Sequence, residues 1–574
     1  MRGGNDKSKT TKKRKYKPAV CNDNMTFQEC ELAVLRQAVD ESEENQGAKI
    51  ATSPDVQKII EILENFLIKK RLICYGGTAI NNILPKQAQF YNRDLEVPDY
   101  DFYSSNAMED ARELSDMYYL SGYDEVEAKS GVHVGTFKVY VNFLPIADIT
   151  QMHPTLYERL MPETITIAGI KYAPPNYLRM SMYLELSRPE GDVSRWEKVL
   201  KRIKLLNKYY PLTSGKTNCN TVDFQRGLDV KANQTEEESI YYLVRDSFVD
   251  QGVVFLGGYG TALYSKYMAN DQRHQVEKIP DFDVLSENPA KCAAIVRDKL
   301  ADAGFKKIQI VQHTGLGEVI PAHVEVSVNG DIIALIYQPI ACHSYNKIDV
   351  SGKQVLVATI DTMLSFYLAF LYANKAYFDK DRMLCMASYL FEVEQKNNLD
   401  QKGLLKRFSL DCYGKQPTME ELREEKARKY EELKGATKPD DRKEFERWFF
   451  KYEPQKTIGL RNPRNRKQVV SRNNHKTPTK TRVLDEDHEY RQPQPQYKNR
   501  VTRRKKLRRT PDAKRTSYAE FDNSISEAEE SFRREHVGRI GLYNKRKSFP
   551  LKKKREQSEG PYAKRIFYFG KKKY

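Results

Sequence analysis

The sequence lacks any Cys-x-x-Cys pair, the spacing on which many zinc sites and redox centres depend. Its eight cysteines are scattered over 574 residues, so we expect neither a zinc knuckle nor a disulfide framework, and a reducing compartment as the setting. No run of eighteen apolar residues occurs, so neither a membrane-spanning helix nor a membrane partner is expected. The basic segment Met1–Lys17 has no apolar core, which argues against a secretory signal peptide.

Positive charge is concentrated toward the C-terminal end of the sequence. Residues 451–574 contain 36 Lys and Arg against 14 Asp and Glu, and the whole chain has a net charge of +18, so residues 1–450 are mildly acidic. Basic runs alternate there with Tyr, Phe, Pro and Gln, a composition that cannot bury much of a core and predicts a partly disordered tail. Such a tail favours an RNA or DNA tether. A nuclear-import run and a solubilising tail are the alternatives.

One pattern occurs twice in the acidic part of the chain. Each time a Gly-Gly turn follows a short apolar strand, and an Asp-x-Asp pair comes later on a second strand. Backbone N–H groups at a helix N-terminus can hold a phosphate, although a lone Gly-Gly pair is often only a turn. The first copy has Gly76, Gly77, Asp99 and Asp101, and the second has Gly257, Gly258, Asp281 and Asp283.

The segment before the first Gly-Gly turn has a helical pattern. Ser53 suits an N-cap and Pro54 suits the first helical position. The apolar residues that follow recur at helical spacing and predict one buried face that ends at Arg71. These residues are Val56, Ile59, Ile60, Leu63, Phe66 and Leu67.

Carboxylates of the first copy have the pattern of a metal site. Asp99 and Asp101 are two residues apart, so on a strand their side chains lie on one side. Two such carboxylates repel each other unless a cation lies between them, and Mg²⁺ prefers oxygen ligands of this kind. Asp148 lies in the apolar strand Pro145–Ile149, where an ionised carboxylate is costly unless it is paired or binds a metal. Exposed turn aspartates and a hydrogen-bonded edge residue are the alternatives.

The second copy lacks this third carboxylate. The strands align without gaps over Phe137–Ile149 in the first copy and Val324–Ile336 in the second. Leu335 then stands where the first copy has its third aspartate. Glu325 and Asp331 are acidic but occupy other positions. We therefore expect one active centre, in the first copy, beside a degenerate one.

The Gly-Gly turn, the Asp-x-Asp strand and the third aspartate resemble the signature of the polymerase-β nucleotidyltransferase superfamily. Their tandem arrangement resembles the poly(A) polymerase catalytic subunits of large nucleocytoplasmic DNA viruses, mimivirus-like and poxvirus-like. The resemblance covers roughly residues 53–390. It implies an α+β (α/β) fold of tandem polymerase-β-like domains, with mixed sheets flanked by helices. The expected division is an arm at 1–25, a catalytic domain at 26–210, a degenerate domain at 211–410, a charged helical segment at 411–450 and a basic tail at 451–574.

The resemblance also assigns roles to individual residues. Three aspartates would bind two divalent ions, Mg²⁺ or Mn²⁺, and the glycine turn and a later helical region would hold the triphosphate. A surface charge or a helix cap is the alternative for the residues of the helical region. The expected metal ligands are Asp99, Asp101 and Asp148, and the expected triphosphate contacts are Gly76, Gly77, Thr78, Arg179, Ser181 and Lys198.

The activity that the resemblance implies is template-independent addition of AMP from ATP to RNA 3′ ends. Another terminal transferase, such as a uridylyl transferase, and a non-catalytic RNA-binding scaffold are the alternatives. The implied partners are ATP and an RNA 3′ end. Because a tail enzyme must hold its RNA through many additions, a homodimer or a processivity subunit is a further expectation. The implied location is the host cytoplasm, in a viral factory, and the virion.

Overall fold

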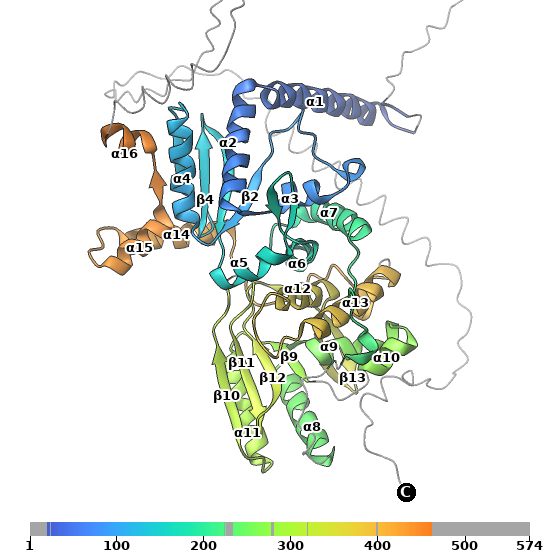
Figure 1. The fold of residues 1–574 in the computed structure, drawn as a ribbon. Coiled ribbons are helices and arrows are strands. Elements are labelled where there is room, and N and C mark those ends of the chain that lie inside the picture. Colours follow the sequence, from blue (N-terminus) through green and yellow to red (C-terminus); the bar gives the residue numbers. More distant parts are fainter. Residues whose placement is uncertain are drawn as a thin grey trace, which may run out of the picture. The chain divides into compact units, whose positions relative to one another are not determined.

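The structure is a computed structural model that describes residues 20–22, 24–222, 224, 234–276, 281–317, 319–397 and 400–461. Residues 1–19 and 462–574 lie outside this part, so the predicted disorder of the basic arm and tail stays a prediction. The described part contains two eight-stranded sheets flanked by helices (Figure 1). This arrangement confirms the predicted α+β class and the duplication. No helix among the described residues is long and apolar enough to cross a membrane.

Seven strands of the two sheets have the same topology, and each sheet has one further strand, β16 (Lys451–Tyr452) at one end of the first and β15 (Cys412–Tyr413) at the other end of the second. In each, three antiparallel strands are followed by a strand that pairs parallel with the third of them. The next strand pairs antiparallel with that one, and the strand after it pairs parallel again. The first sheet has the order β16, β3 (Val126–Ser130), β4 (Thr136–Val141), β5 (Leu144–Gln151), β2 (Tyr100–Ser104), β1 (Ile73–Tyr75), β7 (Ile170–Tyr172) and β6 (Ile165–Ile167). The second has β10 (Ile308–His313), β11 (His323–Val328), β12 (Asp331–Tyr337), β9 (Phe282–Leu285), β8 (Val254–Leu256), β14 (Lys353–Ala358), β13 (His343–Val350) and β15.

Helices follow the same duplicated order. α4 and α11 are equivalent helices, and each covers one face of its own sheet. α4 packs on β3, β4 and β5, and α11 packs on β10, β11 and β12. The helix predicted before the first Gly-Gly turn is α2, and all six of its predicted core residues are buried. The first copy has α1 (Phe27–Ala51), α2 (Pro54–Lys70), α3 (Gly76–Ile83), α4 (Ala107–Leu120), α5 (Pro154–Leu160), α6 (Pro175–Leu186) and α7 (Trp196–Tyr209). The second has α8 (Gln234–Asp250), α9 (Gly257–Leu263), α10 (Asn270–Val276), α11 (Pro289–Asp302), α12 (Ile360–Phe370) and α13 (Lys380–Asn397).

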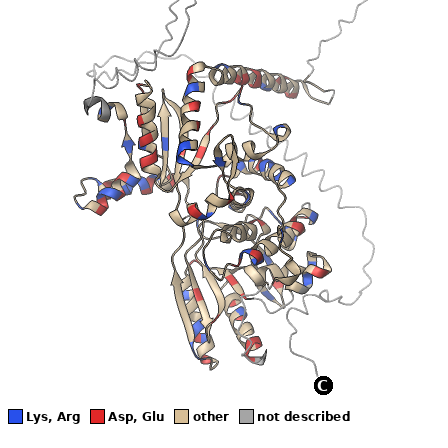
Figure 2. Ribbon diagram, viewed as in Figure 1, with Lys and Arg blue, Asp and Glu red and all other residues tan. Residues whose placement is uncertain are grey.

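The segment after the second copy returns to both sheets. The charged helical segment contains α14 (Met419–Leu433) and α15 (Pro439–Phe449), which carry both signs of charge (Figure 2). β15 pairs with β13 of the second sheet, and β16 pairs with β3 of the first. A further helix, α16 (Pro454–Arg461), follows β16. Residues 451–461, which the expected division assigns to the tail, thus form a strand and a helix, and the two-residue strand has no sequence pattern of its own.

The cysteines correct a second expectation. Six of the eight are paired, as Cys21–Cys30, Cys219–Cys385 and Cys342–Cys412. Buried Cys74 and Cys292 are free. The prediction of no disulfide framework is wrong because two of these pairs join residues 166 and 70 positions apart, which only the fold brings together.

Equivalent helices of the two copies form the contact between them. α6 packs against α12. α6 directly follows β7 and α12 directly follows β14, and these two strands have equivalent positions in their sheets. The contact includes Tyr177 of α6, whose ring meets that of Tyr372 edge to face. Equivalent surfaces therefore meet each other, as in a two-fold interface within one chain.

A buried ion network ties this contact to the C-terminal segment. The Arg407 guanidinium binds the carboxylate of Asp361 on α12 at 2.8–3.0 Å and that of Glu394 on α13 at 2.6 Å. The Tyr183 hydroxyl on α6 donates to Glu394 at 2.9 Å. The Asp361 side chain is 0% exposed, so the network satisfies charges that have no access to water.

We expect Arg407→Ala to lower the free energy of unfolding by about 3–5 kcal/mol, because it leaves two buried carboxylates without their cation. Urea denaturation followed by circular dichroism measures this loss. Arg423→Ala is the matched control, since Arg423 is 68% exposed and its pairing contributes about 1 kcal/mol or less. Equal effects of the two substitutions would contradict the role given to the network.

Candidate active site

The site is built on one lateral row of side chains across the first sheet. Tyr75 of β1 lies opposite Asp101 of β2, and Asp101 lies opposite Asp148 of β5. Asp148 in turn lies opposite Lys138 of β4. Directly opposed residues share a face of a sheet, so the backbone register alone brings two predicted metal ligands together. All four side chains are only half-buried, on the face opposite the one that α4 covers.

Gly76 makes the turn from β1 into α3. Its φ of +72° lies in the left-handed region, which favours glycine. A Cβ there would come within 2.5 Å of the Asp101 carboxylate. Glycine therefore lets the backbone pass directly over this aspartate and brings the α3 N-terminus to it. Gly77, the next residue, lies in the first turn of α3.

Asp99 comes one residue before β2. Its backbone carbonyl accepts a hydrogen bond from the hydroxyl of Thr78, a buried residue of α3. The Thr78 hydroxyl is thus committed to holding the Asp99 loop. This hydrogen bond makes Thr78 a positioning residue for Asp99, and its predicted contact with a triphosphate stays a prediction.

The three carboxylates repel one another. Burial, together with the charges of Asp99 and Asp148, raises the pKa of Asp101 to about 7, and Lys138 and Arg195 oppose this shift. Burial and the charge of Asp148 also raise the pKa of Asp99, against Lys138 and Lys198. Converging carboxylates whose pKa values rise in this way are poised to bind a cation.

Lys138 supplies the cation nearest to the carboxylates. Its ammonium group pairs with Asp148. Burial alone would lower the pKa of Lys138, but the hydrogen bond to Asp148 and its charge outweigh burial and raise it. Asp148 therefore does accept a hydrogen bond, as the alternative interpretation of this residue predicted. The pairing also shows that this position attracts positive charge.

The donor set fits a divalent metal ion. Three carboxylates offer the oxygen ligands that Mg²⁺ and Mn²⁺ prefer. They do not all lie within 4.8 Å of one another. Among the described residues, the group whose ligand atoms all lie within 4.8 Å of one another is Glu190, Cys342 and Cys412. Its two cysteines form a disulfide and so do not offer thiolate ligands.

The second copy repeats the row without the third acid. Asp283 lies opposite Leu335, so the sequence alignment of Leu335 with Asp148 is confirmed by the register. Asp283 is buried, and the Tyr337 hydroxyl donates to it at 3.0 Å. Gly257 has a φ of +62° and packs over Asp283 as Gly76 does over Asp101. The turn and the Asp-x-Asp strand are retained, and the ligand set is incomplete.

Arg179 is not at the site. Its side chain is 0% exposed, and burial lowers its pKa to about 10. Its guanidinium donates to Asn207 at 2.7 Å, to Asn176 and to the Tyr210 carbonyl. The predicted triphosphate contact is wrong for this residue, which instead ties α6 to α7.

The other two predicted helical residues differ from each other. The Ser181 hydroxyl donates to the Tyr177 carbonyl one turn earlier in α6, at 3.3 Å, and so acts within its own helix. Lys198 is exposed on α7, and its charge opposes the raised pKa of Asp99. Of the three residues, Lys198 alone bears electrostatically on the carboxylates.

Sequence reasoning missed a basic residue that faces the glycine turn. A Cβ on Gly77 would lie 2.9 Å from a guanidinium nitrogen of Arg202 and 2.7 Å from the Tyr91 hydroxyl. Arg202 donates to this hydroxyl and lies over the Tyr91 ring, 5.5 Å from its centre. Arg202 follows Lys198 by four residues, so the helical spacing of the two cations on α7 was a usable signal.

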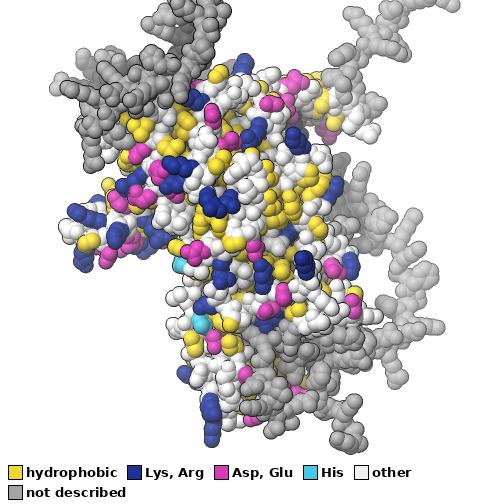
Figure 3. Space-filling view, viewed as in Figure 1, with side chains coloured by type: hydrophobic (Ala, Val, Ile, Leu, Met, Phe, Trp, Pro, Cys, Tyr) yellow, Lys and Arg dark blue, Asp and Glu magenta, His cyan; other side chains and the backbone are white. Residues whose placement is uncertain are grey.

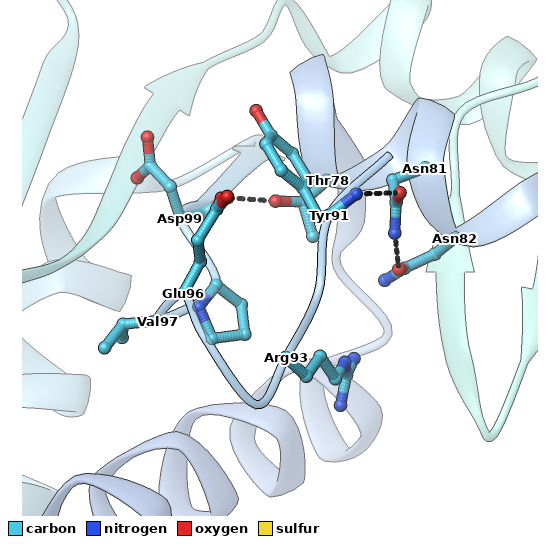
Figure 4. Close-up of a pocket in the computed structure, with 9 residues that line it drawn as sticks. Thr78, Asn81, Asn82, Tyr91, Arg93, Glu96, Val97 and Asp99 are labelled. Atoms are coloured by element: carbon cyan, nitrogen blue, oxygen red, sulfur yellow. Dashed lines mark hydrogen bonds between the residues drawn. The ribbon is translucent and has the colours of Figure 1, made fainter. Parts of the chain in front are cut away.

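A small cavity lies behind the turn (Figure 4). Its volume is about 90 Å³, and Thr78, Asn81, Tyr91 and Asp99 are among its lining residues. The Asn81 side chain accepts from the backbone N–H of Tyr91 at 2.8 Å. Ligand pockets for drug-sized molecules typically have ~300–1,000 Å³, so this cavity is too small for a nucleoside triphosphate.

Residues 61–192, which contain both glycines and all three aspartates of the first copy, match the model of the family described as poly(A) polymerase catalytic subunit. The predicted resemblance is confirmed. The matching segment ends before the second copy begins, so the residues of the first copy carry the likeness.

The sequence is also similar to two curated viral proteins, both named as candidate poly(A) polymerase catalytic subunits. One, from African swine fever virus (isolate Tick/Malawi/Lil 20-1/1983), is 34% identical over 168 residues, which is 28% of this chain and 35% of that protein. The other, from Acanthamoeba polyphaga mimivirus, is 29% identical over 196 residues, or 33% of this chain and 31% of that protein. The chain thus spans about a third of the length of the curated relatives it matches.

The fold is similar to that of the Megavirus polyadenylate synthase. The two structures have a TM-score of 0.62 at 18% sequence identity, over 80% of this chain and 93% of the other. At this identity the likeness establishes the fold. The coverage extends well beyond the first copy, so the tandem arrangement is part of what the two proteins share.

We expect Asp101→Asn to stabilise the protein in EDTA at neutral and alkaline pH. The raised pKa means that the folded state binds a proton more tightly than the unfolded state, so wild-type stability falls between about pH 4 and pH 7. The variant should melt a few degrees above wild type at pH 8, and this difference should vanish toward pH 4.

Thermal melts at several pH values measure this effect, with Asp298→Asn as the control because that carboxylate is 64% exposed. Addition of Mg²⁺ should raise the melting temperature of the wild type more than that of the variant. A variant that melts below wild type at pH 8 would show that the carboxylates do not repel one another as described.

Proposed function

We propose that this chain is a poly(A) polymerase, which adds AMP from ATP to RNA 3′ ends without a template. The observation that supports it most is the direct opposition of Asp101 and Asp148, beside a Gly-Gly turn that begins a helix. The match to the poly(A) polymerase family falls on this same segment. The similar viral proteins support the choice of ATP and RNA as substrates.

In this proposal the residues of the turn bind the triphosphate. The N–H groups of Gly76 and Gly77 lie at the N-terminus of α3, where an anion is favoured. Arg202 and Lys198 supply positive charge from α7. Thr78 keeps the Asp99 loop against the turn through its hydrogen bond. The phosphates and the carboxylates thus meet at one end of the sheet.

Asp99, Asp101 and Asp148 would hold divalent ions, Mg²⁺ or Mn²⁺, in this proposal. Bound ions would neutralise the phosphates and lower the pKa of the RNA 3′-hydroxyl. The 3′-hydroxyl gives its proton to water, its oxygen forms a bond to the α-phosphorus, the bond from this phosphorus to the bridging oxygen breaks, and pyrophosphate leaves. The chain's own part is to converge the carboxylates and orient the triphosphate, and the mechanism involves no covalent intermediate on the protein.

Another terminal transferase and a non-catalytic RNA-binding scaffold are the other candidates. The mutual repulsion of the carboxylates argues against the scaffold, since RNA binding gains nothing from three converging acids. Incubation with an RNA primer, each NTP in turn, and Mg²⁺ or Mn²⁺ separates the three. Long products with ATP alone support the proposal. Long products with UTP would replace it with a uridylyl transferase, and no extension would leave the scaffold.

We expect Asp101→Asn to reduce extension about 10³-fold or more, equivalent to roughly 4 kcal/mol in the activation barrier. Asp283→Asn is its matched control, because Asp283 occupies the same register position in the second copy opposite Leu335. The control should stay within a few-fold of wild type. A loss with Asp283→Asn as deep as that with Asp101→Asn would show that the active copy was wrongly assigned.

A further inference from the structure

The lateral row of the active site continues beyond Asp148 as a row of lysines. Lys138 of β4 lies opposite Lys129 of β3, and Lys129 lies opposite Lys451 of β16. Three lysines therefore stand side by side on three adjacent strands, on the face that carries the carboxylates. The side chains of Lys138, Lys129 and Lys451 are 36%, 43% and 60% exposed, so the row opens to solvent as it leaves the site.

This arrangement works against the stability of the sheet. Like charges directly opposite on neighbouring strands destabilise the pairing. Glu127 offsets part of the repulsion by pairing with Lys129 at 2.9 Å and Lys451 at 3.4 Å, and Glu453 pairs with Lys451 at 2.9 Å. The two lysines are 43% and 60% exposed, and ion pairs at the surface are worth about 1 kcal/mol or less, so an anionic ligand can displace them.

The second copy has no such row. The residues that continue its row past Leu335 are Glu325 of β11 and Val311 of β10. Lys138 thus has an acidic counterpart, and Lys129 has an apolar one. The lysines occur in the copy that has the complete carboxylate set and are absent from the copy that has lost it, as expected for residues that serve the same reaction.

An aromatic ring accompanies the lysines. Tyr140 lies two residues after Lys138 on β4, and its ring faces the ammonium group of Lys129 at 4.3 Å. Interleaved cations and aromatic rings suit single-stranded nucleic acid, because the cations meet phosphates and a ring can stack on a base. On the face of the molecule seen in Figure 3, Lys and Arg are scattered among hydrophobic and acidic side chains.

We propose that Lys138, Lys129 and Lys451 form the track that binds the phosphates nearest the 3′ end of the RNA acceptor. This inference rests on the proposed transfer reaction. The track begins at Lys138, which pairs with Asp148, and crosses two strand spacings of about 4.8 Å each, enough for two or three phosphate contacts. Its outer end lies on β16, the edge strand of the first sheet.

Binding of RNA with single neutral linkages tests the track in the full-length chain. A short oligoadenylate carries one methylphosphonate, placed either at one of the three linkages nearest its 3′ end or near its 5′ end. Affinity is measured without nucleotide for the wild type, for Lys129→Ala/Lys451→Ala, and for the control Lys299→Ala/Lys353→Ala. The control lysines both pair with Asp250 in the second copy and are 40% and 54% exposed.

We expect a neutral linkage near the 3′ end to weaken RNA binding by the wild type several-fold. The same linkage should weaken binding by the Lys129→Ala/Lys451→Ala variant much less, because the lysines that would contact the phosphate charge are already absent. The salt dependence of this variant should be shallower by about 0.7 for each lysine removed. Neutral linkages near the 5′ end should affect all three proteins alike. Melting temperatures check that each variant is folded.

Equal sensitivity of the wild type and the Lys129→Ala/Lys451→Ala variant to the 3′ linkages would overturn the track. The extension assay separates this outcome from failure of the proposed function. Extension by the wild type, together with equal sensitivity of wild type and variant to the 3′ linkages, would refute the track alone. Greater sensitivity of the wild type than of the variant to the 3′ linkages, without extension by any NTP, would refute the transfer reaction, and the lysines would then bind an RNA end for another purpose.

Discussion

Repulsion between half-buried carboxylates is the constraint around which the first copy is organised. Asp101 and Asp148 are opposed by backbone register, so no rearrangement of loops can separate them. Gly76 adds to the constraint because the turn passes directly over Asp101 and leaves no room for a side chain. Such an arrangement is unfavourable in itself and becomes favourable when positive charge is supplied. Lys138 supplies part of that charge in the structure, and the proposed metal ions would supply the rest.

The second copy shows what happens to the same framework when that constraint is relieved. Leu335 removes the third acid, and Asp283 becomes a buried group that accepts a hydrogen bond from Tyr337. The row that carries lysines in the first copy carries Glu325 and Val311 in the second. The copy nevertheless keeps its strand order and its Gly257 turn. It contributes α12 to a contact between equivalent helices, and the Arg407 network fastens that contact.

Much of this could be predicted from the sequence where a pattern is local. The helical period of Pro54–Lys70 fixed its buried face, and the gapless alignment placed Leu335 at the position of Asp148 because sheet registers are equivalent in the two copies. Other features depended on distant partners. Arg179 has the same local pattern whether it faces a nucleotide or Asn207. The pairing of Cys219 with Cys385 spans 166 residues, and β16 is too short to have a pattern.

The lysine row falls between these cases. Each lysine was visible in the sequence, but their alignment with Asp148 depends on three successive registers, one of which brings in a strand from beyond the second copy. Substitution of the third acid tests the central claim most directly. Asp148→Leu gives the first copy the residue of the second. Binding of Mn²⁺ to the full-length chain, followed by electron paramagnetic resonance, should show that this variant loses the tightly bound ions of the wild type, whereas Leu335→Ala keeps them. Undiminished Mn²⁺ binding by Asp148→Leu would contradict the account.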